Sequence, residues 1–243
     1  QDTFGINKSV ALKAISQGLA AMDDFRAQMQ KAGRDVLDQV TKKGTYAVVL
    51  ASRPYQIDGL VNHELPGMFT SRGIPVITCD AVPGVNDVDL TNSRLDIVNN
   101  FHARMLGSAV LAAENDHLEY VQVVSFGCGH DAYLSDEIIR MMEEISGKAP
   151  LVLKLDESDI QGPLRIRVRS FIETIEMRRT RNISRTVKAL SDPYPVKFTK
   201  EDAKEKVVLV PNTSHAFCEV MSAALSGQHV RAVPLPVGRD EAI

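Results

Sequence analysis

The chain has 243 residues, of which 44% are apolar and 24% charged, as in an ordinary globular protein. Its formal net charge of −3 argues against a general attraction to nucleic acid or to anionic lipid. No apolar run approaches the roughly 18 residues that a membrane span needs, and no signal-peptide pattern is present. Three widely spaced cysteines do not form a disulfide framework. We therefore expect a cytoplasmic protein that binds neither nucleic acid nor membrane.

Residues 1–44 are expected to form a helical segment. Apolar residues recur at helical spacing between residues 7 and 43, which predicts one helix, or two with a break near Gly33. We expect the apolar stripe of this segment to pack on a core. The stripe consists of Leu12, Ile15, Leu19, Met22 and Met29. Because residue 1 is Gln and the last residues end in a loop, we expect an internal fragment of a longer protein.

Apolar strands and helical patterns alternate through residues 45–192, the expected main domain. The pattern predicts strands over residues 46–51, 75–80, 120–126 and 151–155, and helices over residues 60–72, 91–115, 132–146 and 164–190. Because the strands are apolar along their whole length, we predict a Rossmann-like parallel α/β sheet with helices on both faces. After a Pro-containing linker, residues 193–243 are expected to begin a second α/β lobe, with strands over 207–210 and 230–235 around a helix over 214–225.

Cys128 is the most informative residue. It lies between Gly127 and Gly129, directly after an apolar strand and before a helical pattern. Ligands of open α/β sheets bind at the carboxyl ends of the strands, and flanking glycines let the backbone approach a bulky partner. A Cys–His nucleophile pair with His130 is disfavoured, because residues so close in sequence rarely align for proton transfer. A zinc site lacks enough ligands in this turn.

Other polar residues follow neighbouring strands and are expected at the same edge. Arg53 and Tyr55 follow the first strand, where a guanidinium and a phenol suit an anionic or carbonyl-bearing ligand, although a simple turn is the alternative. Asp156 and Glu157 end the fourth strand and either orient a ligand or cap the next helix. The arginines of that helix are expected to form a solvated or salt-bridged face.

An iron–sulfur cluster is usually held by four thiolates. Cys79 and Cys218 are the other thiols of this chain. Cys79 also ends a strand and would approach Cys128 if the two strands were neighbours. Both cysteines nevertheless fit the pattern of small buried apolar residues better than that of ligands.

Four segments together resemble signatures of proteins related to acyl-CoA dehydratase activases, in the 2-hydroxyacyl-CoA dehydratase and CoA enzyme activase family. They are LASRPYQID with NHELP (residues 50–58 and 62–66), GIPVIT (73–78), VSFGCGHDA (124–132), and LDE with RIRVRSFIE (155–157 and 165–173). The resemblance covers residues 45 to 235.

This resemblance implies a module of iron–sulfur-dependent radical enzymology, in which an ATP-driven activase passes one electron to a cluster-bearing partner. That partner either dehydrates a 2-hydroxyacyl-CoA or, in related reductases, delivers low-potential electrons. By position, Cys128 corresponds to one ligand of a 4Fe–4S or larger cluster, between Gly127 and Gly129. Arg53 and Tyr55 would be catalytic residues of the adjacent pocket, and Asp156 and Glu157 would shape the surroundings of the cofactor.

The resemblance also implies partners, namely an activase domain or protein and an acyl-CoA. The family's other cluster cysteines are missing from this chain, so we expect the chain alone to hold no cluster and to be inactive. Two alternatives remain open. One is a non-catalytic docking module in which Cys128 is structural. The other is a binding domain for coenzyme A or another phosphorylated ligand, with the basic helix facing the phosphates.

Overall fold

The computed structural model describes residues 5–97, 99–125, 128–155, 161–189 and 197–235. The chain divides into two compact units, Gln1–Pro193 and Tyr194–Ile243. Within the part of the chain that the structure describes, no helix is both long enough and apolar enough to cross a bilayer.

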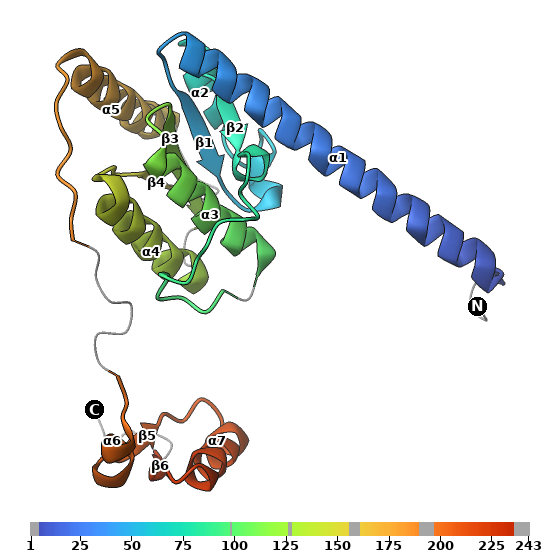
Figure 1. The fold of residues 1–243 in the computed structure, drawn as a ribbon, viewed down its shortest axis with the longest axis vertical. Helices are drawn as coiled ribbons and strands as arrows, with labels where there is room; N and C mark the ends of the chain where they lie inside the picture. Colours follow the sequence, from blue (N-terminus) through green and yellow to red (C-terminus); the bar gives the residue numbers. More distant parts are fainter. Residues whose placement is uncertain (1–4, 98, 126–127, 156–160, 190–196, 236–243) are drawn as a thin grey trace. The chain divides into compact units, whose positions relative to one another are not determined.

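A four-stranded parallel sheet forms the centre of the first unit, in the order β2-β1-β3-β4 (Figure 1). The strands are β1 (Ala47–Ala51), β2 (Val76–Thr78), β3 (Leu118–Ser125) and β4 (Leu151–Leu155). The two central strands, β1 and β3, are buried at every residue except the last of β3. This burial explains the wholly apolar sequence of β1 and the largely apolar sequence of β3, and it confirms the predicted parallel α/β fold.

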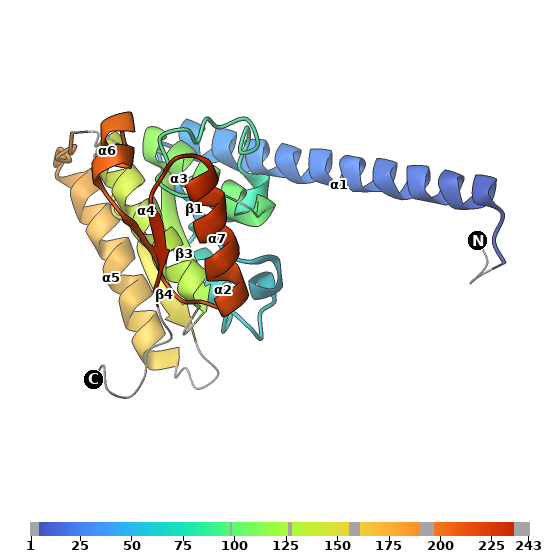
Figure 2. The ribbon, with the colours of Figure 1, turned by 90° about the horizontal axis from the view of Figure 1, so that it is seen from below.

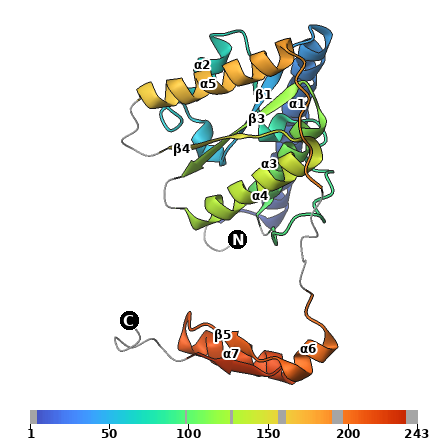
Figure 3. The same ribbon diagram turned by 90° about the vertical axis from the view of Figure 1, so that its left-hand side faces the viewer.

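Helices cover both faces of this sheet (Figure 3). Helices α1, α3 and α4 pack with β1 and β3 on one face, and α2 and α5 pack on the other. Their bounds are α1 (Lys8–Lys42), α2 (Leu65–Thr70), α3 (Asn100–Glu114), α4 (Gly129–Ser146) and α5 (Gln161–Thr180). Two short 3-10 helices follow strands β1 and β2, namely η1 (Pro54–Ile57) and η2 (Cys79–Ala81).

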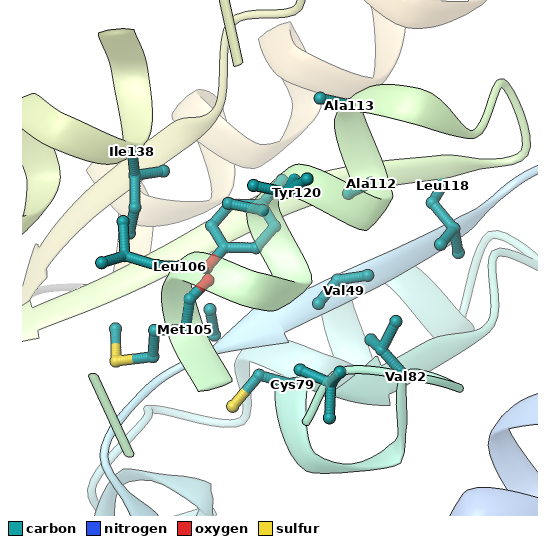
Figure 4. Close-up of a cluster of buried hydrophobic side chains, with 14 of the residues drawn as sticks. Val49, Cys79, Val82, Met105, Leu106, Ala112, Ala113, Leu118, Tyr120 and Ile138 are labelled. Carbon is teal, nitrogen blue, oxygen red and sulfur yellow. Dashed lines mark hydrogen bonds between the residues drawn. The ribbon is translucent and has the colours of Figure 1, made fainter. Parts of the chain in front are cut away.

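The core beneath α3 and α4 is centred on Tyr120 of β3 (Figure 4). Its ring is fully buried, and its hydroxyl donates a 2.6 Å hydrogen bond to the carbonyl oxygen of Met105. Burial raises the pKa of this phenol well above its ordinary value. Cys79 belongs to the same apolar cluster, which places its thiol inside the core.

Two predicted helices have different bounds in the structure. Helix α3 begins at Asn100 rather than near residue 91, because Glu137 of α4 binds both the backbone N–H and the guanidinium of Arg94 and holds that segment outside the helix. Helix α5 ends at Thr180 rather than near residue 190. Asn182 follows with a φ of 47°, the left-handed conformation that commonly ends helices.

The N-terminal helix is continuous through Gly33 and differs from expectation in its packing. An added Cβ at Gly33 would lie 1.8 Å from the carbonyl oxygen of Ala81, so this glycine permits close packing of α1 against η2. Every residue from 12 to 28 is exposed. The expectation that the whole apolar stripe packs on the core is therefore wrong for its first four members, because α1 extends beyond the sheet (Figure 2).

The second unit contains α6 (Lys200–Glu205), β5 (Val208–Val210), α7 (His215–Gly227) and β6 (Ala232–Pro234). Strands β5 and β6 pair in parallel, and α7 connects them. The predicted strand–helix–strand order is confirmed, whereas α6 was not expected from the sequence. Thr199 begins α6 with a capping box that it forms with Asp202.

Candidate functional site

Three segments meet at the carboxyl edge of the sheet. They are the η1 loop after β1, the last residue of β3 and the first turn of α4. Because β1 and β3 are paired neighbours, with Ala51 opposite Gln122, the segments that follow them lie side by side. The structure thereby brings Arg53 and Tyr55 to the region of Cys128, as expected for polar residues at one sheet edge.

The guanidinium of Arg53 holds the sulfur of Cys128. Its Nη2 donates to Cys128 Sγ at 2.7 Å and to Asp131 Oδ1 at 2.8 Å. The side chain of Asp131 is only 3% exposed and that of Arg53 is 22% exposed. Burial by itself lowers the pKa of Arg53, but the bonds to Asp131 and Cys128 outweigh it, so the net shift is upward and the guanidinium stays charged.

Asp131 connects this ion pair to the sheet. Its second oxygen, Oδ2, accepts a 2.8 Å hydrogen bond from the backbone N–H of Ser125 at the end of β3. Asp131 lies in the first turn of α4, where the helix dipole favours a carboxylate. This structural role of Asp131 was not predicted from the sequence. The sequence signal that could have indicated this role is an acidic residue at the start of a helix that follows a buried strand.

Tyr55 lies at the rim of the site rather than on the sulfur. Its hydroxyl is 3.1 Å from Ser125 Oγ, which also accepts a 3.1 Å hydrogen bond from Gln56 Nε2. Gln56 is buried, and its Oε1 accepts from the backbone N–H of Arg53 at 2.9 Å. Buried Asn62 donates to the carbonyl oxygens of Gln56 and Ile57. The loop that carries Arg53 is therefore fixed by two amide side chains, neither of which was predicted as a site residue.

Aromatic and histidine rings form the wall beside Arg53. The Phe101 ring lies 5.9 Å from its guanidinium carbon, and the rings of His102 and His130 stack at 5.9 Å. Burial and the charge of Arg53 lower the pKa of His102, so this ring is neutral at neutral pH. His130 Nδ1 is 2.6 Å from the hydroxyl of Tyr133.

Three of the predicted site residues, Gly127, Asp156 and Glu157, lie outside the described residues. Gly129 opens α4, and no described atom outside its own helix and its chain neighbours lies within 4 Å of the position that a Cβ would occupy there. The described residues therefore leave the backbone beside Cys128 uncovered on this side.

The thiols of the described chain do not by themselves fit an iron–sulfur cluster. Burial raises the pKa of Cys79 to about 12, and β1 separates β2, which precedes Cys79, from β3. Cys218 is buried in the second unit, where its Sγ donates to the carbonyl oxygen of Pro211. No group of three or more His, Cys, Asp and Glu side chains within the described ranges is arranged to hold a metal. Only Cys128 is a partly exposed thiol, whereas a cluster usually takes four.

The fold and the site define a parallel α/β module that presents one cysteine at the carboxyl edge of its sheet. Residues 1–82, about a third of the 243, match the family model described as the CoA enzyme activase uncharacterised domain (DUF2229). The match confirms the resemblance over the segment that contains Arg53 and Tyr55. Searches of curated proteins and of solved structures found no match.

Proposed function

We propose that this chain is the α/β module of an iron–sulfur-dependent redox protein related to 2-hydroxyacyl-CoA dehydratases and their ATP-driven activases. Its role is in low-potential electron transfer or acyl-CoA dehydration, and Cys128 supplies one ligand of the cluster. The observation that carries the proposal is the hydrogen bond from Arg53 to a partly exposed sulfur at the carboxyl edge of the sheet.

The residues around Cys128 support a ligand role because they fix the sulfur without covering it. Arg53 is held by Asp131, and Asp131 is held by the backbone of Ser125. Hydrogen bonds to ligating sulfurs and nearby charge are means by which proteins set the reduction potential of a cluster. In this proposal Arg53 supplies both, and Tyr55 and Ser125 present hydroxyl groups at the rim for a bound acyl group or partner.

A single suitable thiol requires that the other ligands come from outside the described residues. In this proposal they belong to another segment of a longer parent protein or to a partner subunit. Such a partner would cover the edge at Cys128 and shield the cluster from water. The chain by itself is then expected to be inactive, and an ATP-dependent activase would supply the electron.

The test is the iron and acid-labile sulfide content of the full natural protein, purified without oxygen. Cys128→Ser should lose most of the iron, because serine is a poor ligand for iron in such clusters. Cys218→Ser is the matched control, since Cys218 is buried in the second unit and hydrogen-bonded to a carbonyl oxygen. Equal iron in both variants, or none in the unaltered protein, would overturn the ligand assignment.

A groove between α2 and α5 favours a second candidate function, the binding of coenzyme A or another phosphorylated ligand. Its volume is about 540 Å³. Three exposed arginines line it, Arg72 from the turn after α2 and Arg165 and Arg169 from α5. Guanidinium groups bind phosphate through paired N–H donors. Glu64 also lines the groove, so an anionic ligand must be held mainly by the arginines.

Coenzyme A should raise the melting temperature of the 243-residue chain, because a ligand that binds the native state stabilises it. Pantetheine, which lacks the phosphates, should have little effect. Replacing Arg72 and Arg165 by Ala should abolish the shift, and Arg34→Ala, on the exposed surface of α1, should preserve it. An equal shift with pantetheine, or no shift with either compound, would exclude this candidate.

A further inference from the structure

The N-terminal half of α1 carries an apolar stripe that nothing in the described structure covers. All residues from 12 to 28 are exposed, and α1 projects beyond the sheet over this stretch (Figures 1 and 2). Large apolar side chains of this half of the helix are each more than half exposed, namely Leu12, Ile15, Leu19 and Met22 on the stripe and Val10 and Phe25 beside it. Most of the stability of helices in proteins comes from the packing of an apolar face.

The exposed stripe continues a seam that is already packed in the second half of the helix. Positions 12, 15, 19, 22, 26, 29, 33, 36 and 40 alternate steps of three and four residues, the spacing of a coiled-coil seam. From Met29 onward the seam packs against the core of the first unit, with Gly33 and Val40 buried. Arg26 is the single charged member, and Asp23 pairs with it at 3.2 Å.

The exposed part of the seam is complementary to itself when two copies run antiparallel. With a two-fold axis at the level of Gln17, Leu12 faces Met22 of the other copy, and Ile15 faces Leu19. On the flank of the seam, Phe25 meets Ala11 of the other copy, so that a large side chain is opposite a small one. Such a self-complementary patch is the requirement of a symmetric dimer.

The charges of the same stretch favour the antiparallel direction. Lys8 and Lys13 lie toward its beginning, and Asp23, Asp24 and Arg26 lie toward its end, so the two ends carry formal charges of +2 and −1. An antiparallel pair brings the basic end of one helix to the acidic end of the other, whereas a parallel pair would place like charges together.

We propose that residues 8–28 of α1 pair with the same residues of a second copy as an antiparallel two-helix coiled coil. A groove of about 720 Å³ lies where the seam meets the body of the first unit, lined by Met22, Phe25 and Met29 with Val85, Val88 and Leu90. The beginning of the second copy's helix reaches this groove. Gly33 is 16 residues from the axis, about 24 Å along the helix, so the two bodies lie well apart.

The mass of the 243-residue chain in solution, measured by sedimentation at micromolar concentration, tests the proposal. The unaltered chain should be a dimer, and the double variant Ile15→Asp with Leu19→Asp should be a monomer. Val10→Asp is the matched control, because Val10 and Ile15 are both 58% exposed but Val10 lies off the seam. A monomeric unaltered chain, or a Val10→Asp variant that dissociates like the double variant, would overturn the proposal.

Cross-linking with a short bis-maleimide tests the direction of pairing, in a chain that carries Cys128→Ser. Ser16→Cys should link to itself across the two-fold axis. Leu12→Cys should not, because the two copies of residue 12 lie about 15 Å apart along the helices. A link through Leu12→Cys without one through Ser16→Cys would indicate parallel helices and would contradict the proposed antiparallel pairing. These outcomes are independent of the role proposed for Cys128.

Discussion

Asp131 is the residue on which the geometry of the candidate site depends. It accepts hydrogen bonds from the Arg53 guanidinium and from the backbone of Ser125, and therefore joins the β1 loop to the end of β3. Arg53 in turn holds the Cys128 sulfur. The thiol is thus positioned by a carboxylate that does not touch it.

We expect Asp131→Asn to destabilise the first unit by about 1.5–3 kcal/mol, because the variant removes a charged hydrogen-bond partner from a largely buried guanidinium. Urea unfolding of the chain measures the effect. Asp136→Asn, on the exposed face of the same helix, should change the stability by less than about 0.5 kcal/mol. If both variants had equal stability, the buried ion pair would not hold the site together.

At the scale of single elements, α1 is one helix with a packed half and an exposed half. Its second half is fixed against η2 at Gly33, where no side chain fits, and its first half is exposed. Gly33→Ala should destabilise the fold by about 1–3 kcal/mol, because the new methyl group would overlap the backbone of Ala81. Thermal unfolding measures the change. Gly18→Ala, in the exposed half of the same helix and with no described atom outside that helix near the Cβ position, is the control, and an equal loss there would contradict the packing argument.

Lys148 holds the end of α3 from inside the protein. Its fully buried Nζ donates to the carbonyl oxygens of Ala112, Asn115 and Leu118. Burial, the largest influence, lowers its pKa to about 8. Between this value and the ordinary lysine pKa, the unfolded chain binds more protons than the folded chain, so this group makes the free energy of unfolding rise with pH.

The comparison of Lys148→Met with the unaltered chain isolates this effect. The variant should be less stable at neutral pH, because three backbone oxygens lose their buried donor. The difference in the free energy of unfolding should then increase between about pH 8 and pH 10. Urea titrations at several pH values measure it, and a difference that stays constant or falls over this range would contradict the lowered pKa.

At the scale of the whole molecule, the two units differ greatly in the size of their cores. The first unit has apolar clusters on both faces of its sheet. Within the described part of the second unit, the buried residues are Val210, Cys218 and Ser222. A two-stranded sheet with so small a core is marginally stable at best.

Hydrogen exchange of the whole chain should therefore show two levels of protection. The backbone amides of β5 and α7 should exchange by low-energy local opening, whereas those of β1 and β3 should exchange only on global unfolding of the first unit. Mass spectrometry of peptides from the exchanged protein distinguishes the two levels of protection. Equal protection of both units would mean that the second unit is stabilised by contacts beyond its own core.

The sequence by itself determined the order of strands and helices, because uninterrupted apolar runs such as Ala47–Ala51 and Gly147 at the end of α4 are local signals. It also indicated that Arg53, Tyr55 and Cys128 lie at one edge, since parallel strands end together. Only the tertiary structure decided which of them touch. Packing between segments far apart in sequence decides the hydrogen bond from Arg53 to the sulfur and the support of Arg53 by Asp131. It also decides that the first half of α1 is exposed. No local sequence pattern encodes such packing.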